Sequence, residues 1–146
     1  MPNGRLIYIS VAVRPMSAPE LTAIATRSAE KNAKVDVTGL LVYSRGTFLQ
    51  LLEGPILSVI NVYEMIKKDP RHTSITQLAF GSCNSRLFAE WGMGLVDLTS
   101  GVGMSSLPFS SLHAFAKSIE SMKAQQSAAP LVAELMRQLS PQSAAA

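Results

Sequence analysis

Two polar side chains, Tyr8 and Gln50, stand inside aliphatic runs that are typical of buried strands. Tyr8 lies in LIYISV and Gln50 lies in FLQLLEG. A buried hydroxyl or amide without a hydrogen bond costs about 1–3 kcal/mol, so each group needs a partner. That partner can be the other member of the pair, a neighbouring side chain or a bound ligand. A phenol beside an amide offers proton chemistry, because an amide both accepts and donates hydrogen bonds.

The elements that would position this pair follow one another as βαββαβ and one further strand. Ser17 and Glu20 form a capping box that begins the first helix. Pro70 disfavours helix in the residue before it, which ends the second helix. Ser44-Arg45-Gly46 has the length and the glycine of a hairpin loop. The patterns predict strands at residues 6–13, 38–43, 47–53, about 74–82 and about 92–97, and helices from Ser17 to about Asn32 and from Pro55 to about Lys68.

This order predicts a ferredoxin-like βαββαββ fold, an α/β protein of the α+β kind with a five-stranded mixed sheet. In the prediction, strands 6–13 and 47–53 lie side by side in the middle of the sheet and are parallel, because both crossovers are right-handed. Side chains alternate between the two faces of a strand. Tyr8 and Ser10 therefore share one face with Gln50, and the other face is aliphatic. We expect the two helices on the polar face.

Two amphipathic stripes follow the sheet, at residues 112–122 and 131–139. Such stripes need an apolar surface, and the aliphatic face of the sheet is the predicted one. We therefore expect a sheet domain at 1–98, a helical cap or interface segment at 99–140 and a disordered tail at 141–146.

The composition fits one globular domain. The chain has 146 residues, of which 47% are hydrophobic and 16% charged. Its net charge of +3 is scattered rather than gathered into a basic patch, so we expect no nucleic-acid partner. No apolar run approaches the roughly 20 residues of a membrane span. The first residues do not resemble a signal peptide. We expect a cytoplasmic protein without membrane contact.

Cysteine and histidine are scarce. Cys83 is the single cysteine, so no intramolecular disulfide can form. With His72 and His113 as the only histidines, a Cys/His metal cluster is not expected. We predict no metal ion.

The predicted site is an apolar slot between the two helices with a few converging polar groups, which is the general description of a small-molecule site. The amide of Asn32 can pair with both donor and acceptor edges of a flat heterocycle. The polar members of the slot are Tyr8, Ser10, Ser28, Asn32 and Gln50, and its walls are Ile24, Phe48 and Ile66.

The residues at this slot match a family pattern. The matching segments are LIYISVA with Tyr8 and Ser10, Asn32 at the helix end, TGLLVYSRGTFLQLLEGP, DPRHTSI and FAEWGMGL with Trp91 and Met93. Over about residues 5–98 the chain resembles the BLUF domain, the blue-light sensor that uses FAD, in its short stand-alone form.

The resemblance implies a role for each polar residue. The isoalloxazine ring would lie between the two helices, with Asn32 on its pyrimidine edge. Gln50 would lie between the Tyr8 hydroxyl and the N5/O4 edge of the flavin. Tyr8 would donate an electron and a proton to the excited flavin. Their return would leave the hydrogen bonds of Gln50 rearranged, by rotation or by tautomerisation of the amide.

The resemblance also implies a relay and a phosphate-side contact. Trp91 and Met93 would relay the change outward, and which of them faces the flavin stays open. Arg71 and His72, with Asp69 beside them, would face the ribityl-phosphate tail. Lys31 stands where the family often has His or Asn; it would contact a phosphate or remain solvated.

We therefore predict a blue-light photoreceptor that binds FAD non-covalently and is not an enzyme. It would signal to an unidentified protein partner or through a homo-oligomer, a dimer or larger. One alternative is a small ferredoxin-like enzyme, such as a phosphatase or isomerase. It would need a charged catalytic group in the crevice, which we expect to be neutral. The other alternative is a ligand-binding or interaction module without photochemistry.

Overall fold

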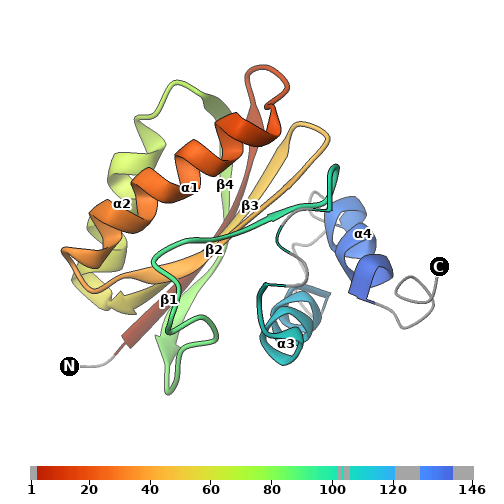
Figure 1. Ribbon diagram of the computed structural model, residues 1–146. Helices are drawn as coiled ribbons and strands as arrows, with labels where there is room; N and C mark the ends of the chain where they lie inside the picture. Colours follow the sequence, from red (N-terminus) through yellow and green to blue (C-terminus); the bar gives the residue numbers. More distant parts are fainter. Residues whose placement is uncertain (1–2, 102, 104–105, 121–128, 140–146) are drawn as a thin grey trace.

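One sheet separates two layers of helices (Figure 1). The computed structural model describes residues 3–101, 103, 106–120 and 129–139. The elements are β1 (Asn3–Ala12), α1 (Ala18–Ala33), β2 (Thr38–Ser44), β3 (Thr47–Pro55), α2 (Ile56–Lys67), β4 (His72–Cys83), β5 (Gly94–Asp97), α3 (Phe109–Glu120) and α4 (Ala129–Leu139). The predicted βαββαββ order with two further helices is confirmed.

The central strands β1 and β3 are antiparallel, so the prediction of a parallel pair was wrong. The strand order is β4-β1-β3-β2-β5, and Tyr8 lies directly opposite Gln50. The reason lies in the connections. The α1 crossover makes β1 and β2 run the same way, and β3 returns from β2 through a hairpin and is inserted between them. The expected adjacency of Tyr8 and Gln50 is confirmed.

The β2–β3 hairpin fixes the register of the site. Its two loop residues, Arg45 and Gly46, have φ angles of 48° and 84°. Positive φ at both positions is the type I′ geometry, whose twist matches that of the paired strands. Gln50 lies four residues after Gly46, so the turn sets Gln50 opposite Leu41 of β2.

Helix α1 begins as the sequence predicts. The Ser17 side chain accepts from the backbone of Glu20, and the Glu20 side chain accepts from the backbone of Ser17. Leu21, Ala25 and Asn32 form its buried face. The capping box therefore sets the start of a helix whose other end delivers Asn32 to the sheet.

Two separate cores lie on the two faces of the sheet. On the polar face, Tyr8 packs with α1 and α2 through residues such as Leu21 and Val59. On the other face, aliphatic residues of the sheet pack against α3 and α4, as Figure 1 shows. The fully buried residues of that second core include Leu40, Leu49, Leu51, Phe88, Leu112, Phe115, Ile119 and Leu135. The prediction that the C-terminal helices cover the aliphatic face is confirmed.

Some predicted bounds differ from the observed ones. β4 is longer than the predicted 74–82, and β5 is shorter than the predicted 92–97, so Met93 lies just before β5. Met122 and the predicted disordered tail at 141–146 lie outside the described residues. Within the described ranges, no helix is long and apolar enough to cross a bilayer.

Candidate functional site

The buried polar pair is joined by a direct hydrogen bond. The Tyr8 hydroxyl donates to Oε1 of Gln50. The other end of the amide, Nε2, donates to Sδ of Met93 at 3.2 Å. A thioether is a weak acceptor, so the two ends of the Gln50 amide are held unequally. A stronger acceptor near Nε2 would compete well with the sulfur.

The environment of Tyr8 keeps its phenol neutral. Burial raises the pKa of Tyr8 far above its usual value, and the nearby Tyr63 and Asp69 raise it further. The Tyr63 ring centroid lies 5.4 Å from that of Tyr8. Because a free phenolate is disfavoured here, removal of an electron must be accompanied by transfer of the proton. Oε1 of Gln50 is the group in place to receive it.

His72 and Ser10 form a second, partly buried hydrogen-bonded pair beside Tyr8. Nε2 of His72 lies 2.8 Å from the carbonyl oxygen of Ile66, and Nδ1 lies 2.8 Å from Oγ of Ser10. A carbonyl can only accept, so Nε2 carries a hydrogen and, in the neutral ring, Nδ1 accepts from Ser10. Both ring nitrogens are thus engaged within the protein, and His72 fastens β4 to β1 and to the end of α2.

Two adjoining cavities lie between α1 and α2. The inner one, of about 70 Å³, surrounds Tyr8, and the outer one measures about 380 Å³. The volume of the outer cavity is in the range of small-molecule sites. Six residues line both cavities: Ile24, Ser28, Gln50, Ile66, Asp69 and Arg71. Gln50 therefore faces the outer cavity while it is bonded to Tyr8 in the inner one.

Most predicted cofactor-binding residues come together here. Tyr8, Phe48 and His72 line the inner cavity, and Lys31 and Asn32 line the outer one. Ser10 lines neither cavity and acts through its bond to His72. The structure thus brings most of the predicted residues together, and it gives Ser10 and His72 internal partners that the sequence analysis did not foresee.

The crevice is not wholly neutral, contrary to expectation. Asp69 and Arg71 line both cavities and pair with each other: Nε of Arg71 donates to Oδ1 of Asp69 at 2.9 Å. The bonds from Arg71 lower the pKa of Asp69, which is therefore ionised. Arg27 and Lys31, one turn apart on α1, add two exposed cations to the rim. The Asp69–Arg71 pair thus reaches both cavities, whereas the two cations of α1 lie at the outer one only.

Sequence analysis missed several lining residues. Arg27 was not singled out, although it precedes Lys31 by four residues and so shares its helix face. On α2, residues Ser58, Asn61 and Met65 also line the outer cavity. Their spacing of three and four residues puts them on one helical face. That pattern was available in the sequence.

Asn32 links the slot to the segment before β5. It is buried at the end of α1, and its Nδ2 donates to the carbonyl oxygen of Gly92 at 3.0 Å. Gly92 lies so close to α1 that an added Cβ would be 3.0 Å from atoms of Ala29. The Asn32 amide keeps a second hydrogen and an acceptor oxygen for a ligand.

Met93 faces the site and Trp91 does not. Met93 is buried with Tyr8 in the core under α1 and α2. Trp91 packs on the opposite core, where its ring centroid lies 6.5 Å from that of Phe88. In this structure Met93 is therefore the member of the pair that contacts Gln50. Among the described residues, no group of three His, Cys, Asp or Glu side chains could hold a metal ion.

The site therefore combines a neutral phenol, two amides and a flat apolar slot with cations at the rim. Comparison with known proteins agrees with this geometry. Residues 4–94 match the family model BLUF, described as sensors of blue light using FAD. The beta subunit of the photoactivated adenylate cyclase of Euglena longa is 42% identical over 87 residues, which are 59% of this chain and 10% of that protein.

Two further relatives lead to the same family. The blue light- and temperature-regulated antirepressor BluF of Escherichia coli (strain K12) is 42% identical over 79 residues, 54% of this chain and 19% of that protein. The dark-state structure of BlrB, a BLUF protein, has a TM-score of 0.66 at 24% identity, covering 92% of this chain and 95% of that one, and it shows a shared fold. The chain spans only a small part of the curated relatives it matches. Because the family model covers more than half of the chain, the protein belongs to the BLUF family of blue-light sensors that use FAD.

Proposed function

We propose that Tyr8 and Gln50 form the light-driven switch of this sensor. The observation that carries the proposal is the continuous hydrogen-bonded series from the Tyr8 hydroxyl through the Gln50 amide to the Met93 sulfur. Each member is buried in the sheet's polar-face core. A change at Tyr8 can therefore reach Met93 through one side chain.

The residues of the slot fit a flavin. Ser28, Asn32 and Gln50 supply the donors and acceptors that the polar edge of its ring needs. Arg27 and Lys31 offer charge to phosphates at the rim. When bound, FAD supplies the absorption of blue light and an electron-accepting ring.

Tyr8 acts as the donor of an electron and a proton in this proposal. The Tyr8 hydroxyl transfers its proton to Oε1 of Gln50, and the electron and the proton return to Tyr8 afterwards. The net change is the hydrogen-bond pattern of Gln50. Rotation of the amide or a change of its tautomer would each withdraw the donor from the Met93 sulfur. Met93 then loses its tie to β3 and can move together with β5.

The output is proposed to pass to a partner protein or through a homo-oligomer rather than through catalysis by this chain. The matched relatives support this, since their names join light sensing to an adenylate cyclase subunit and to an antirepressor. Residues 1–98 would form the photosensor. Residues 99–140, which include α3 and α4, would form its cap or interface.

Absorption spectroscopy tests the proposal. The purified chain should be yellow, and blue light should shift its flavin absorption reversibly to longer wavelength. Tyr8→Phe should keep the flavin and lose the shift. Tyr63→Phe is the matched control, because the Tyr63 ring packs on Tyr8 whereas the hydroxyl bonded to Gln50 is that of Tyr8. A full reversible shift in Tyr8→Phe would contradict the assignment.

A further inference from the structure

Glu53 is a fully buried carboxylate on the face of β3 opposite Gln50. Its exposed fraction is 0%, and the odd spacing of three residues puts the two side chains on opposite faces. Arg5 lies directly across from it on β1. The Arg5 Nε donates to Oε2 of Glu53 at 2.8 Å. A buried carboxylate is tolerated only with such partners.

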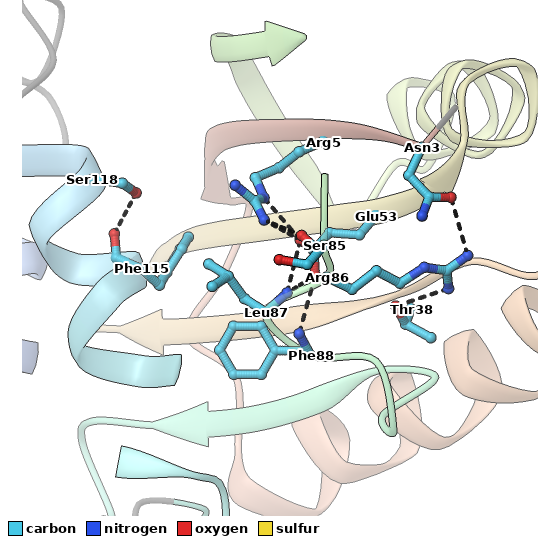
Figure 2. A network of polar contacts seen from close by, with 10 residues as sticks. All are labelled: Asn3, Arg5, Thr38, Glu53, Ser85, Arg86, Leu87, Phe88, Phe115 and Ser118. Atoms are coloured by element: carbon cyan, nitrogen blue, oxygen red, sulfur yellow. Dashed lines mark hydrogen bonds and ion pairs between the residues drawn. The ribbon is translucent and has the colours of Figure 1, made fainter. Parts of the chain in front are cut away.

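The other partners of Glu53 are backbone groups of the segment that connects β4 to β5. The backbone nitrogen of Leu87 lies 2.9 and 3.0 Å from the two carboxylate oxygens, and that of Phe88 lies 3.1 Å from Oε1. Arg5 also donates to the carbonyl oxygen of Ser85 at 2.9 Å. Figure 2 shows Glu53 joined to Arg5 on one side and to this segment on the other. The carboxylate thus ties an irregular segment to the central strands.

The tied segment leads directly to Trp91. The Phe88 ring is fully buried, with centroids 6.5 Å from Trp91 and 6.4 Å from Phe115 of α3. The Phe88 carbonyl accepts from the backbone nitrogen of Trp91 at 3.2 Å, and the Trp91 carbonyl accepts from that of Gly39 at 3.0 Å. A displacement of Phe88 would therefore displace Trp91.

Gly92 and Met93, the two residues after Trp91, are bonded to residues of the site. Asn32 donates a hydrogen bond to the Gly92 carbonyl, and Gln50 donates one to the Met93 sulfur. Residues 87–93 are thus attached at their start by Glu53 and at their end by Gln50, both from β3.

We propose that Glu53 is a positioning residue of the switch. It holds residues 85–93 so that the Met93 sulfur stays at the Gln50 amide and Trp91 stays packed on Phe88. Strand β3 is thus bonded to this segment through Glu53 on one face of the sheet and through Gln50 on the other. The inference deepens the proposed function and rests on it only where light is used as the readout.

Glu53→Gln is the sharpest variant, because it keeps the shape of the side chain. An amide has one acceptor oxygen where the carboxylate has two. Its NH₂ group would face either the guanidinium of Arg5 or the backbone N–H groups of Leu87 and Phe88, all of which are donors. The variant therefore breaks the attachment on one of its two sides with little change in volume.

Trp91 is the single tryptophan of the chain, so its fluorescence reports on this segment. The full flavin-loaded chain is kept dark, and acrylamide quenching of Trp91 is measured, followed by dark recovery after blue light. In Glu53→Gln the quenching constant should rise by about twofold or more and the recovery time should change by about threefold or more. Glu20→Gln, which breaks the surface pair with Arg14, is the control and should leave both values unchanged.

Arg5 variants keep the test decisive if Glu53→Gln does not fold. Arg5→Met leaves the backbone donors in place and should raise quenching in the same direction by a smaller amount, and Arg5→Lys should restore it. Wild-type quenching in Glu53→Gln or, failing that variant, in Arg5→Met would overturn the inference. An equal rise in Glu20→Gln would overturn it too. Absence of a light-induced shift in the wild type would instead contradict the proposed function, while quenching in the dark still decides the role of Glu53.

Discussion

The sulfur of Met93 accepts a hydrogen bond from the Gln50 amide nitrogen at 3.2 Å. This contact joins the residue that touches Tyr8 to the residue that precedes β5. Because a thioether accepts weakly, the contact is strong enough to orient the amide and weak enough to be broken when the amide rearranges.

Met93→Leu should slow dark recovery. Leucine keeps the apolar volume but removes the acceptor, so the dark arrangement of Gln50 loses the bond that forms on the way back to it. Loss of a hydrogen bond worth about 0.5–1 kcal/mol corresponds to a dark-recovery rate about two- to fivefold lower. The time course of the absorbance after blue light checks this. Met65→Leu, an exposed methionine at the outer cavity, should recover at the wild-type rate, and faster recovery in Met93→Leu would contradict the prediction.

Asn32→Ala should weaken flavin binding. The variant removes the amide from the slot and also releases the Gly92 carbonyl from α1. A loss of about 1 kcal/mol or more of binding free energy raises the Kd for the flavin by about fivefold or more. Titration of the flavin-free chain with FAD, followed by flavin fluorescence, measures Kd. Asn84→Ala, on the exposed segment after β4, should bind as the wild type does; equal Kd values for both variants would refute a role for Asn32.

Phe115→Ala should destabilise the fold. Phe115 is fully buried on α3 against Phe88, and truncation of such a residue costs about 3–5 kcal/mol. The free energy of unfolding in urea measures the loss. Phe109→Ala on the same helix is the control, because Phe109 is 57% exposed. If the two variants were equally stable, α3 would not pack on the sheet in solution.

The stability contributed by Glu20 should depend on pH. Hydrogen bonds from Arg14, and then from Ser17, lower the pKa of Glu20 from 4.5 to about 2. A depressed carboxylate pKa contributes stability that is complete above the ordinary pKa and is lost as pH falls through the lowered one. The difference in unfolding free energy between wild type and Glu20→Gln should therefore be constant above pH 4.5 and shrink between pH 4.5 and about 2.

Urea unfolding at several pH values within and above this window measures that difference. Arg14→Met removes the first cause of the shift, so in that background the same difference should shrink at higher pH. A difference that stays constant down to pH 2 in the wild-type background would contradict the assignment.

The sequence predicted the helices and strands because the signals for their ends and turns are local. The capping box at Ser17 and the turn at Arg45-Gly46 each follow from a few neighbouring residues. The direction of β3 relative to β1 depends on which strand is inserted between which, and that step was misjudged. The contact of Met93 rather than Trp91 with Gln50 was not predictable either, because both residues lie in an irregular segment whose path no local pattern gives.

Glu53 was missed for a different reason. It ends the aliphatic run of β3 and was taken with the strand, although a charged residue in such a run needs a partner as much as Gln50 does. Its cross-strand neighbour Arg5 was visible in the sequence. The backbone donors of Leu87 and Phe88 were not, because no residue type reveals which N–H groups of an irregular segment will converge.

The cross-strand register of Tyr8 and Gln50 also bears on protein design. The pair is set by the hydrogen-bond ladder between two adjacent strands, and a slip of one residue would turn one side chain to the opposite face of the sheet. Transplanting the pair into another scaffold therefore requires two antiparallel strands with the right alignment, a covered face, and a turn such as Arg45-Gly46 that keeps the register of the strand carrying Gln50.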